Sequence, residues 1–116
     1  MYEVLGRERV SRGRYGRFLV EFTCKWPEGV ESLYLVSSFT AFFPGRLELL
    51  REGGRGRVRV ALWEGVYRYR FASTCGVSFL DEENPRRERL RLWPDSDRLE
   101  EFSVAEVGVG DYRRCL

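Results

Sequence analysis

The acidic residues that stand closest together in this sequence are Asp81, Glu82 and Glu83. Most glycoside hydrolases need two carboxyl groups that face each other across a cleft at about 5–9 Å. Here the three residues are adjacent and run into Asn84-Pro85, a dipeptide typical of turns. Because the 116 residues include no histidine, the Ser-His-Asp and Cys-His arrangements are excluded as well. The sequence therefore predicts a hydrated acidic corner and no catalytic residues.

The three cysteines, Cys24, Cys75 and Cys115, are widely spaced along the chain. Without histidine, they do not form any of the usual zinc-binding patterns, so neither a metal nor another cofactor is expected. A Cys24–Cys75 disulfide is one alternative. The other is three free thiols: one buried, one in a loop and one in the C-terminal tail.

Six arginines alternate with other residues along three predicted strands: Arg57, Arg59, Arg68, Arg70, Arg89 and Arg91. If these strands were neighbours, their shared face could meet phosphates or stack on bases, as in a nucleic-acid-binding domain. The alternative is a solvated face whose arginines pair with glutamates, each pair contributing about 0–1 kcal/mol. A contact with an acidic partner domain is a third possibility. The net charge of only +2 argues against a dedicated polyanion binder and favours the second alternative.

Alternation with a period of two dominates the pattern of apolar residues. Seven or eight short strands are separated by turn signals, which predicts an all-β, immunoglobulin-like sandwich of mostly antiparallel strands. We expect Tyr67, Tyr69 and Phe71 to be buried against Phe18, Val20 and Val60. The segment 30–38 is apolar on both faces, as in a central strand or one beside a partner domain.

The length predicts one domain, residues 1–107, followed by a tail or linker at 108–116. The N-terminus lacks the apolar stretch of a signal peptide, so a cytoplasmic location is expected.

Three motifs together resemble a known family: Ser38-Phe39-Thr40-Ala41-Phe42, the ten residues from Leu62 to Phe71 (LWEGVYRYRF), and Asp81-Glu82-Glu83-Asn84-Pro85. The chain is similar to the starch- and glycogen-binding modules of the immunoglobulin-like early set. These modules occur at the N-termini of α-amylase-superfamily enzymes and in the β subunit of AMP-activated protein kinase. The likeness is greatest to the N-terminal domains of cyclomaltodextrinase, neopullulanase and maltogenic amylase.

This resemblance implies a non-catalytic module that binds α-glucan or accompanies a glucan-processing enzyme. Its site residues would be Phe42 and Phe43 as the ring platform, Arg70 as a donor to sugar hydroxyls, and Phe79 on the far side. Binding-competent members usually have tryptophan at the first ring and a second tryptophan that here falls at Val77 or Ser78, so binding should be weak. Alternatively, Phe42 and Phe43 cap the end of the sandwich.

The partners implied by the resemblance are an α-glucan oligosaccharide, a catalytic (β/α)₈ barrel of about 250 further residues, and a second copy of the chain in a homodimer. The chain is then either an excised domain or a free-standing relative. An alternative function is domain packing or dimerisation without sugar binding. In that case Trp63, Trp93 and the segment 30–38 would be interface residues.

Overall fold

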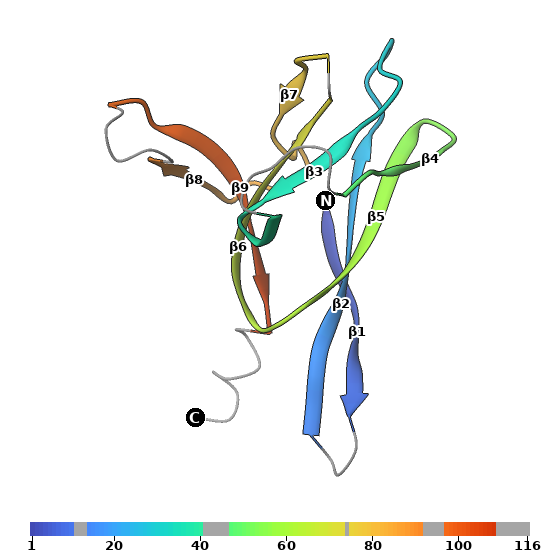
Figure 1. Cartoon of the computed structure of the whole chain (residues 1–116), viewed down its shortest axis with the longest axis vertical. Helices are drawn as coiled ribbons and strands as arrows, with labels where there is room; N and C mark the ends of the chain where they lie inside the picture. Colours follow the sequence, from blue (N-terminus) through green and yellow to red (C-terminus); the bar gives the residue numbers. More distant parts are fainter. Residues whose placement is uncertain (11–13, 41–46, 74, 92–96, 109–116) are drawn as a thin grey trace.

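The computed structural model describes residues 1–10, 14–40, 47–73, 75–91 and 97–108. Within these ranges the chain is all-β, with two antiparallel sheets that pack as a sandwich (Figure 1). The first sheet has the spatial order β1, β2, β5, β4: β1 (Tyr2–Val10), β2 (Arg14–Lys25), β5 (Arg55–Leu62) and β4 (Leu50–Glu52). The second has the order β3, β6, β9, β8, with β7 also paired to β6: β3 (Tyr34–Ser37), β6 (Gly65–Ala72), β9 (Glu100–Val107), β8 (Arg87–Leu90) and β7 (Ser78–Phe79). A 3₁₀ turn, η1 (Ser38–Thr40), follows β3. The predicted fold class is confirmed.

The core lies between β2 of the first sheet and β6 of the second. Alternate residues of β2 point inward, so Val20 and Phe22 have no exposed surface. Tyr69 and Phe71 of β6 are equally buried, and the ring centroid of Tyr69 lies 4.9 Å from that of Phe22 in an edge-on contact. Tyr67 is partly buried against the same cluster. The aromatic face predicted for this strand therefore does form the core.

Strand β1 was not predicted by the alternation of apolar residues. Its pairing with β2 contains two register shifts, one between Val4 and Gly6 and one between Arg7 and Arg9. Each shift displaces the following side chains relative to the pleat, so the apolar residues of β1 do not keep a period of two. The described part of the chain consequently has nine strands where seven or eight were expected.

The segment 47–52 connects the two sheets along one side of the sandwich. Leu35 donates its backbone N–H to Leu47, and Leu49 donates to Leu33, each at 2.8 Å. The next residues form β4, which pairs with β5 of the other sheet. Leu35 and Val36 point to opposite sides of β3, yet both are buried within the described chain, so the apolar residues on both faces of the segment 30–38 do not require a partner domain.

None of the helices in the described ranges is long and apolar enough to span a membrane.

Candidate functional site

The acidic corner is built around a buried carboxylate. Only 2% of the surface of Asp81 is exposed. Its carboxylate accepts hydrogen bonds from the Tyr69 hydroxyl at 2.6 Å and from the Glu83 backbone N–H at 3.1 Å, and it forms an ion pair with the Met1 amino group. Glu82 and Glu83 are exposed. The expectation of a hydrated acidic turn is therefore wrong for Asp81, because hydrogen-bond donors from distant parts of the chain replace water around it.

Asn84 completes this polar network. Its side-chain amide donates to the Tyr69 hydroxyl at 3.0 Å and to the Val104 carbonyl at 2.8 Å. Its side-chain oxygen accepts from the Arg86 N–H at 3.0 Å. Burial and the hydrogen bond to Asp81 raise the pKa of Tyr69. The side chains of Asp81 and Asn84 thus hold the corner against β6 and β9, which is a structural role. The corner does not present two carboxylates separated across a cleft.

Arg70 lies on the outer face of the second sheet. Its Nε donates to the Ser78 hydroxyl at 2.7 Å, and its guanidinium forms a 3.4 Å ion pair with Glu100. The guanidinium carbon also lies 5.5 Å from the centre of the Phe102 ring. These contacts fix Arg70 along the sheet surface, beside a hydroxyl and a carboxylate that can also bind a polar ligand.

Phe79 lies on the other face of the same sheet. It pairs with Phe71 across β6 and β7, and the two ring centroids are 5.5 Å apart. Since Phe71 is in the core and Arg70 precedes it, the side chains of Arg70 and Phe79 point to opposite faces. Phe42 and Phe43 lie outside the described residues. Of the four predicted sugar-binding residues, the two that are described are thus not brought together.

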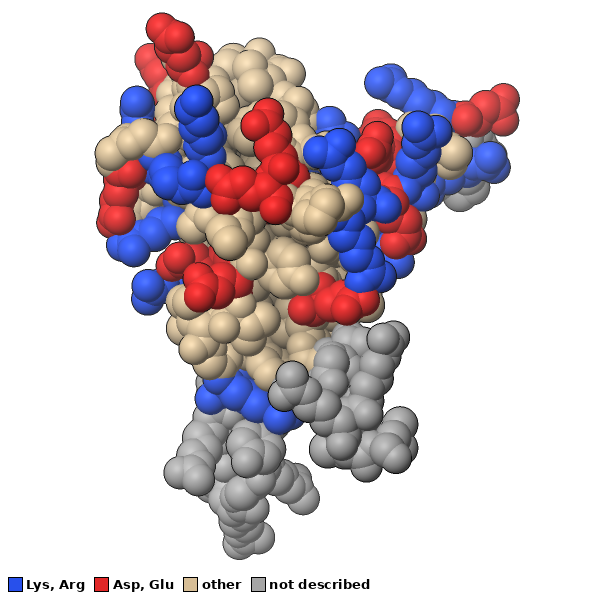
Figure 2. All heavy atoms as spheres, turned by 180° about the vertical axis from the view of Figure 1, so that it is seen from behind, with Lys and Arg blue, Asp and Glu red and all other residues tan. Residues whose placement is uncertain are grey.

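The arginines do not form one basic face. Arg57 and Arg59 belong to the first sheet and pair with Glu52 and Glu21, whereas Arg68 and Arg70 belong to the second and pair with Glu88 and Glu100. Figure 2 shows basic and acidic side chains interspersed over the face of the molecule seen there. The arrangement matches the alternative of a solvated surface with paired charges.

Two cysteines are described, and both are free thiols. Cys24 is buried, and burial raises its pKa to about 11. Cys75 is exposed and lies 3.0 Å from the hydroxyl of Ser73. Cys115 is outside the described residues. The alternative of a Cys24–Cys75 disulfide is wrong in this structure, and the described residues contain no cluster of side chains suited to a metal ion.

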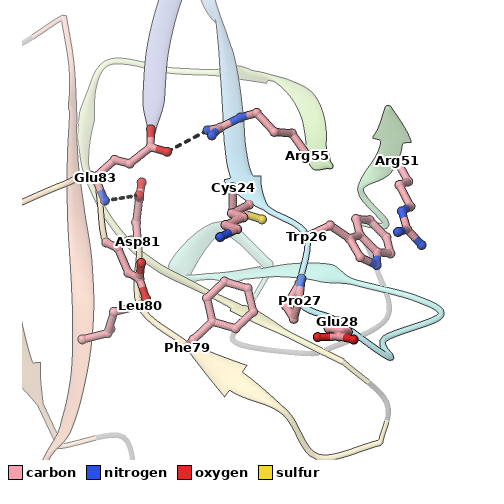
Figure 3. Close-up of a pocket in the computed structure, with 12 residues that line it drawn as sticks. Cys24, Trp26, Pro27, Glu28, Arg51, Arg55, Phe79, Leu80, Asp81 and Glu83 are labelled. Atoms are coloured by element: carbon pink, nitrogen blue, oxygen red, sulfur yellow. Dashed lines mark hydrogen bonds and ion pairs between the residues drawn. The ribbon is translucent and has the colours of Figure 1, made fainter. Parts of the chain in front are cut away.

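A groove of about 660 Å³ opens at one end of the sandwich. It is lined by residues 24–28 at the end of β2, by Arg51 and Arg55, and by residues 79–83 (Figure 3). Trp26 is 93% buried beside it, with its indole N–H bonded to the Val30 carbonyl at 2.7 Å. Phe79 therefore belongs to this groove.

Sequence reasoning missed the groove because its walls come from three separated segments. The available signal was the Trp26-Pro27 pair directly after an alternating strand. A large aromatic residue there indicates a packed end of the sandwich, but the opposite wall of the groove depends on how the strands are paired.

Comparison with solved structures finds a likeness in fold. The chain matches maltogenic amylase from S. marinus with a TM-score of 0.80 and 31% sequence identity, over 92% of its own length. The predicted resemblance is confirmed. The match covers only 16% of the amylase chain, so the protein corresponds in fold to a small part of such an enzyme. No protein-family model and no curated protein matches the sequence.

Proposed function

We propose that this chain is a non-catalytic accessory domain of an amylase-type glycoside hydrolase and that it binds α-glucan weakly. The observation that carries this proposal is the unequal coverage of the structural match. Nearly all of this chain, but only 16% of the amylase chain, takes part in it. The remainder of such an enzyme would hold the catalytic (β/α)₈ barrel that the resemblance implies.

The chemistry of the described residues supports a non-catalytic role. The cluster of acidic residues begins with Asp81, which is buried and already accepts two hydrogen bonds. General acid or base catalysis requires a carboxyl group that can reach a substrate proton. The chain alone should therefore release no reducing sugar from maltodextrin.

The outer face of the second sheet offers groups that suit sugar hydroxyls. Arg70 and Ser78 provide donors, and Glu100 provides an acceptor. Phe42 and Phe43 would add the ring platform from the segment after η1. Because no tryptophan stands at Val77 or Ser78, one stacking contact of about 1–3 kcal/mol is absent, and the expected dissociation constant is of millimolar order.

A titration of the labelled chain with β-cyclodextrin, followed by backbone amide shifts, tests this proposal. We expect shifts in the segments 39–45 and 70–78, and we expect them to shrink in Arg70→Ala. Arg57→Ala is the matched control, since Arg57 is also ion-paired with a glutamate but lies on the other sheet. A dissociation constant of about 10 mM corresponds to a binding free energy of roughly 3 kcal/mol. The absence of any shift at this sugar concentration would exclude sugar binding.

A second candidate function, domain packing or dimerisation, is favoured by one observation. Trp63 is 64% exposed, and Leu19, on the outer face of the first sheet, is 38% exposed. Tryptophan is enriched at protein–protein interfaces relative to the rest of the surface. Sedimentation of the chain and of Trp63→Ser distinguishes the candidates. A dimer that dissociates in the variant supports the dimerisation function. A parent chain that stays monomeric at high concentration opposes self-association.

A further inference from the structure

The groove at the end of the sandwich has the size and composition of a ligand site. Its volume of about 660 Å³ lies within the range of small-molecule sites, about 300–1,000 Å³. It is separate from the outer face that holds Arg70, because Phe79 and Arg70 point to opposite sides of the second sheet.

Part of the groove wall is apolar. Phe79 is half-buried, with its ring held against Phe71, and Pro27 lies near it in Figure 3. An aromatic ring with one side on the core and the other toward a groove presents a flat apolar surface. Such a surface suits the C–H face of a pyranose ring.

The rim of the groove carries equal numbers of opposite charges. Six exposed side chains surround it, three cationic and three anionic: Lys25, Arg51, Arg55, Glu28, Glu82 and Glu83. An anion or a cation would meet a like charge on the rim as well as an opposite one. A neutral polyol, whose hydroxyls both donate and accept, can use every one of these groups.

Two of the cationic side chains are held in place before any ligand binds. Arg55 forms a 2.9 Å ion pair with Glu83, joining the two walls of the groove. The guanidinium of Arg51 lies over the Trp26 ring, 5.2 Å from its centre. Side chains that are already ordered lose less conformational entropy on binding, which favours recognition.

We propose that this groove is a second α-glucan site, in which a short maltooligosaccharide packs on Phe79 and is hydrogen-bonded by Arg55, Arg51 and the rim carboxylates. The proposal rests on the α-glucan binding proposed above. It assigns Phe79 to the groove, separately from the Arg70 surface.

The test is a maltoheptaose titration of the labelled full chain and of two variants. Arg55→Ala removes a groove residue, and Arg59→Ala is its control. Both arginines are on β5, both are ion-paired with a glutamate (2.9 Å and 2.8 Å), and their side chains are similarly exposed at 48% and 54%. We expect the amides of residues 24–26, 28, 51–55 and 79–83 to shift, with affinity about tenfold lower in Arg55→Ala and unchanged in Arg59→Ala.

The pattern of shifts separates the two proposals. Shifts confined to the segments 39–45 and 70–78, with equal affinity in both variants, would overturn the groove site and leave α-glucan binding intact. Equal weakening by Arg55→Ala and Arg59→Ala would also overturn it. No shift anywhere would remove both.

Discussion

Asp81 shows how the surroundings of a single side chain decide its role. Its acidic neighbours predict a hydrated turn, but its hydrogen-bond donors make it a structural anchor. The carboxylate joins the Tyr69 hydroxyl of β6 to the corner that leads into β8. A buried carboxylate is tolerated here because donors satisfy it.

Replacing Asp81 by asparagine should destabilise the fold. An amide keeps one acceptor oxygen and gains two donors, so either the Tyr69 hydroxyl or the Glu83 N–H loses its partner. We expect the free energy of unfolding in urea to fall by about 1–3 kcal/mol. Glu82→Gln, at the exposed neighbouring position, should change it little. Equal stability of Asp81→Asn and the parent chain would show that the network contributes nothing.

Cys24 should make stability depend on pH in the alkaline range. Burial raises its folded-state pKa from 9.0 to about 11, so the folded state keeps the thiol proton that the unfolded state loses above about pH 9. The contribution of Cys24 to the free energy of unfolding is fully present below pH 9. It is lost as the pH rises through 11, and the free energy of unfolding is then about 2 kcal/mol lower at pH 11. Urea denaturation at pH 8 and pH 11 should therefore show a smaller decrease in Cys24→Ala. The same decrease in both proteins would contradict this origin, since Tyr69, whose pKa is also raised, is present in each.

The sequence predicts the burial of some of these side chains but not of others. The burial of Tyr69 and Phe71 follows from their alternation with Arg68 and Arg70. The burial of Asp81 does not, because its partners Tyr69 and Ser103 are 12 and 22 residues away. Only the folded arrangement brings them together.

At the scale of the strands, the pairing register decides which side chains share a face of the sheet. The alternation of apolar residues within each strand does not determine this. Arg70 and Phe79 were predicted to hold one ligand, yet the pairing of Phe71 with Phe79 sends them to opposite faces. A shift of one residue in the turn between β6 and β7 would have put Arg70 and Phe79 on the same face. Sequence alone does not determine that register, so the strands were predictable while the composition of the site was not.

Gly56 of β5 leaves the space that Trp26 occupies. A Cβ atom at this position would lie 3.0 Å from the Trp26 ring and 3.1 Å from the Leu49 side chain. Gly56→Ala should therefore lower the free energy of unfolding by about 1–3 kcal/mol through overpacking. Gly54→Ala is the control, because a Cβ there meets nothing within 4 Å. Thermal and urea unfolding check the difference, and a Gly56→Ala chain as stable as Gly54→Ala would show that Trp26 can move aside.

At the scale of the whole molecule, two antiparallel sheets enclose one aromatic core and leave two surfaces that we propose bind ligands. One is the outer face beside Arg70, and the other is the groove between residues 24–28 and 79–83. The fold class was predictable because alternation and turns recur along the chain. The groove was not, since it exists only where the ends of strands from both sheets meet.

The central claim is that the isolated chain binds α-glucan without hydrolysing it. Co-sedimentation with insoluble amylose, with cellulose as the control polysaccharide, tests it most directly. We predict that amylose retains the chain, that soluble maltoheptaose releases it, that cellulose leaves it in solution, and that no reducing sugar appears. Equal partition onto amylose and cellulose, or none onto either at high amylose concentration, would contradict the account.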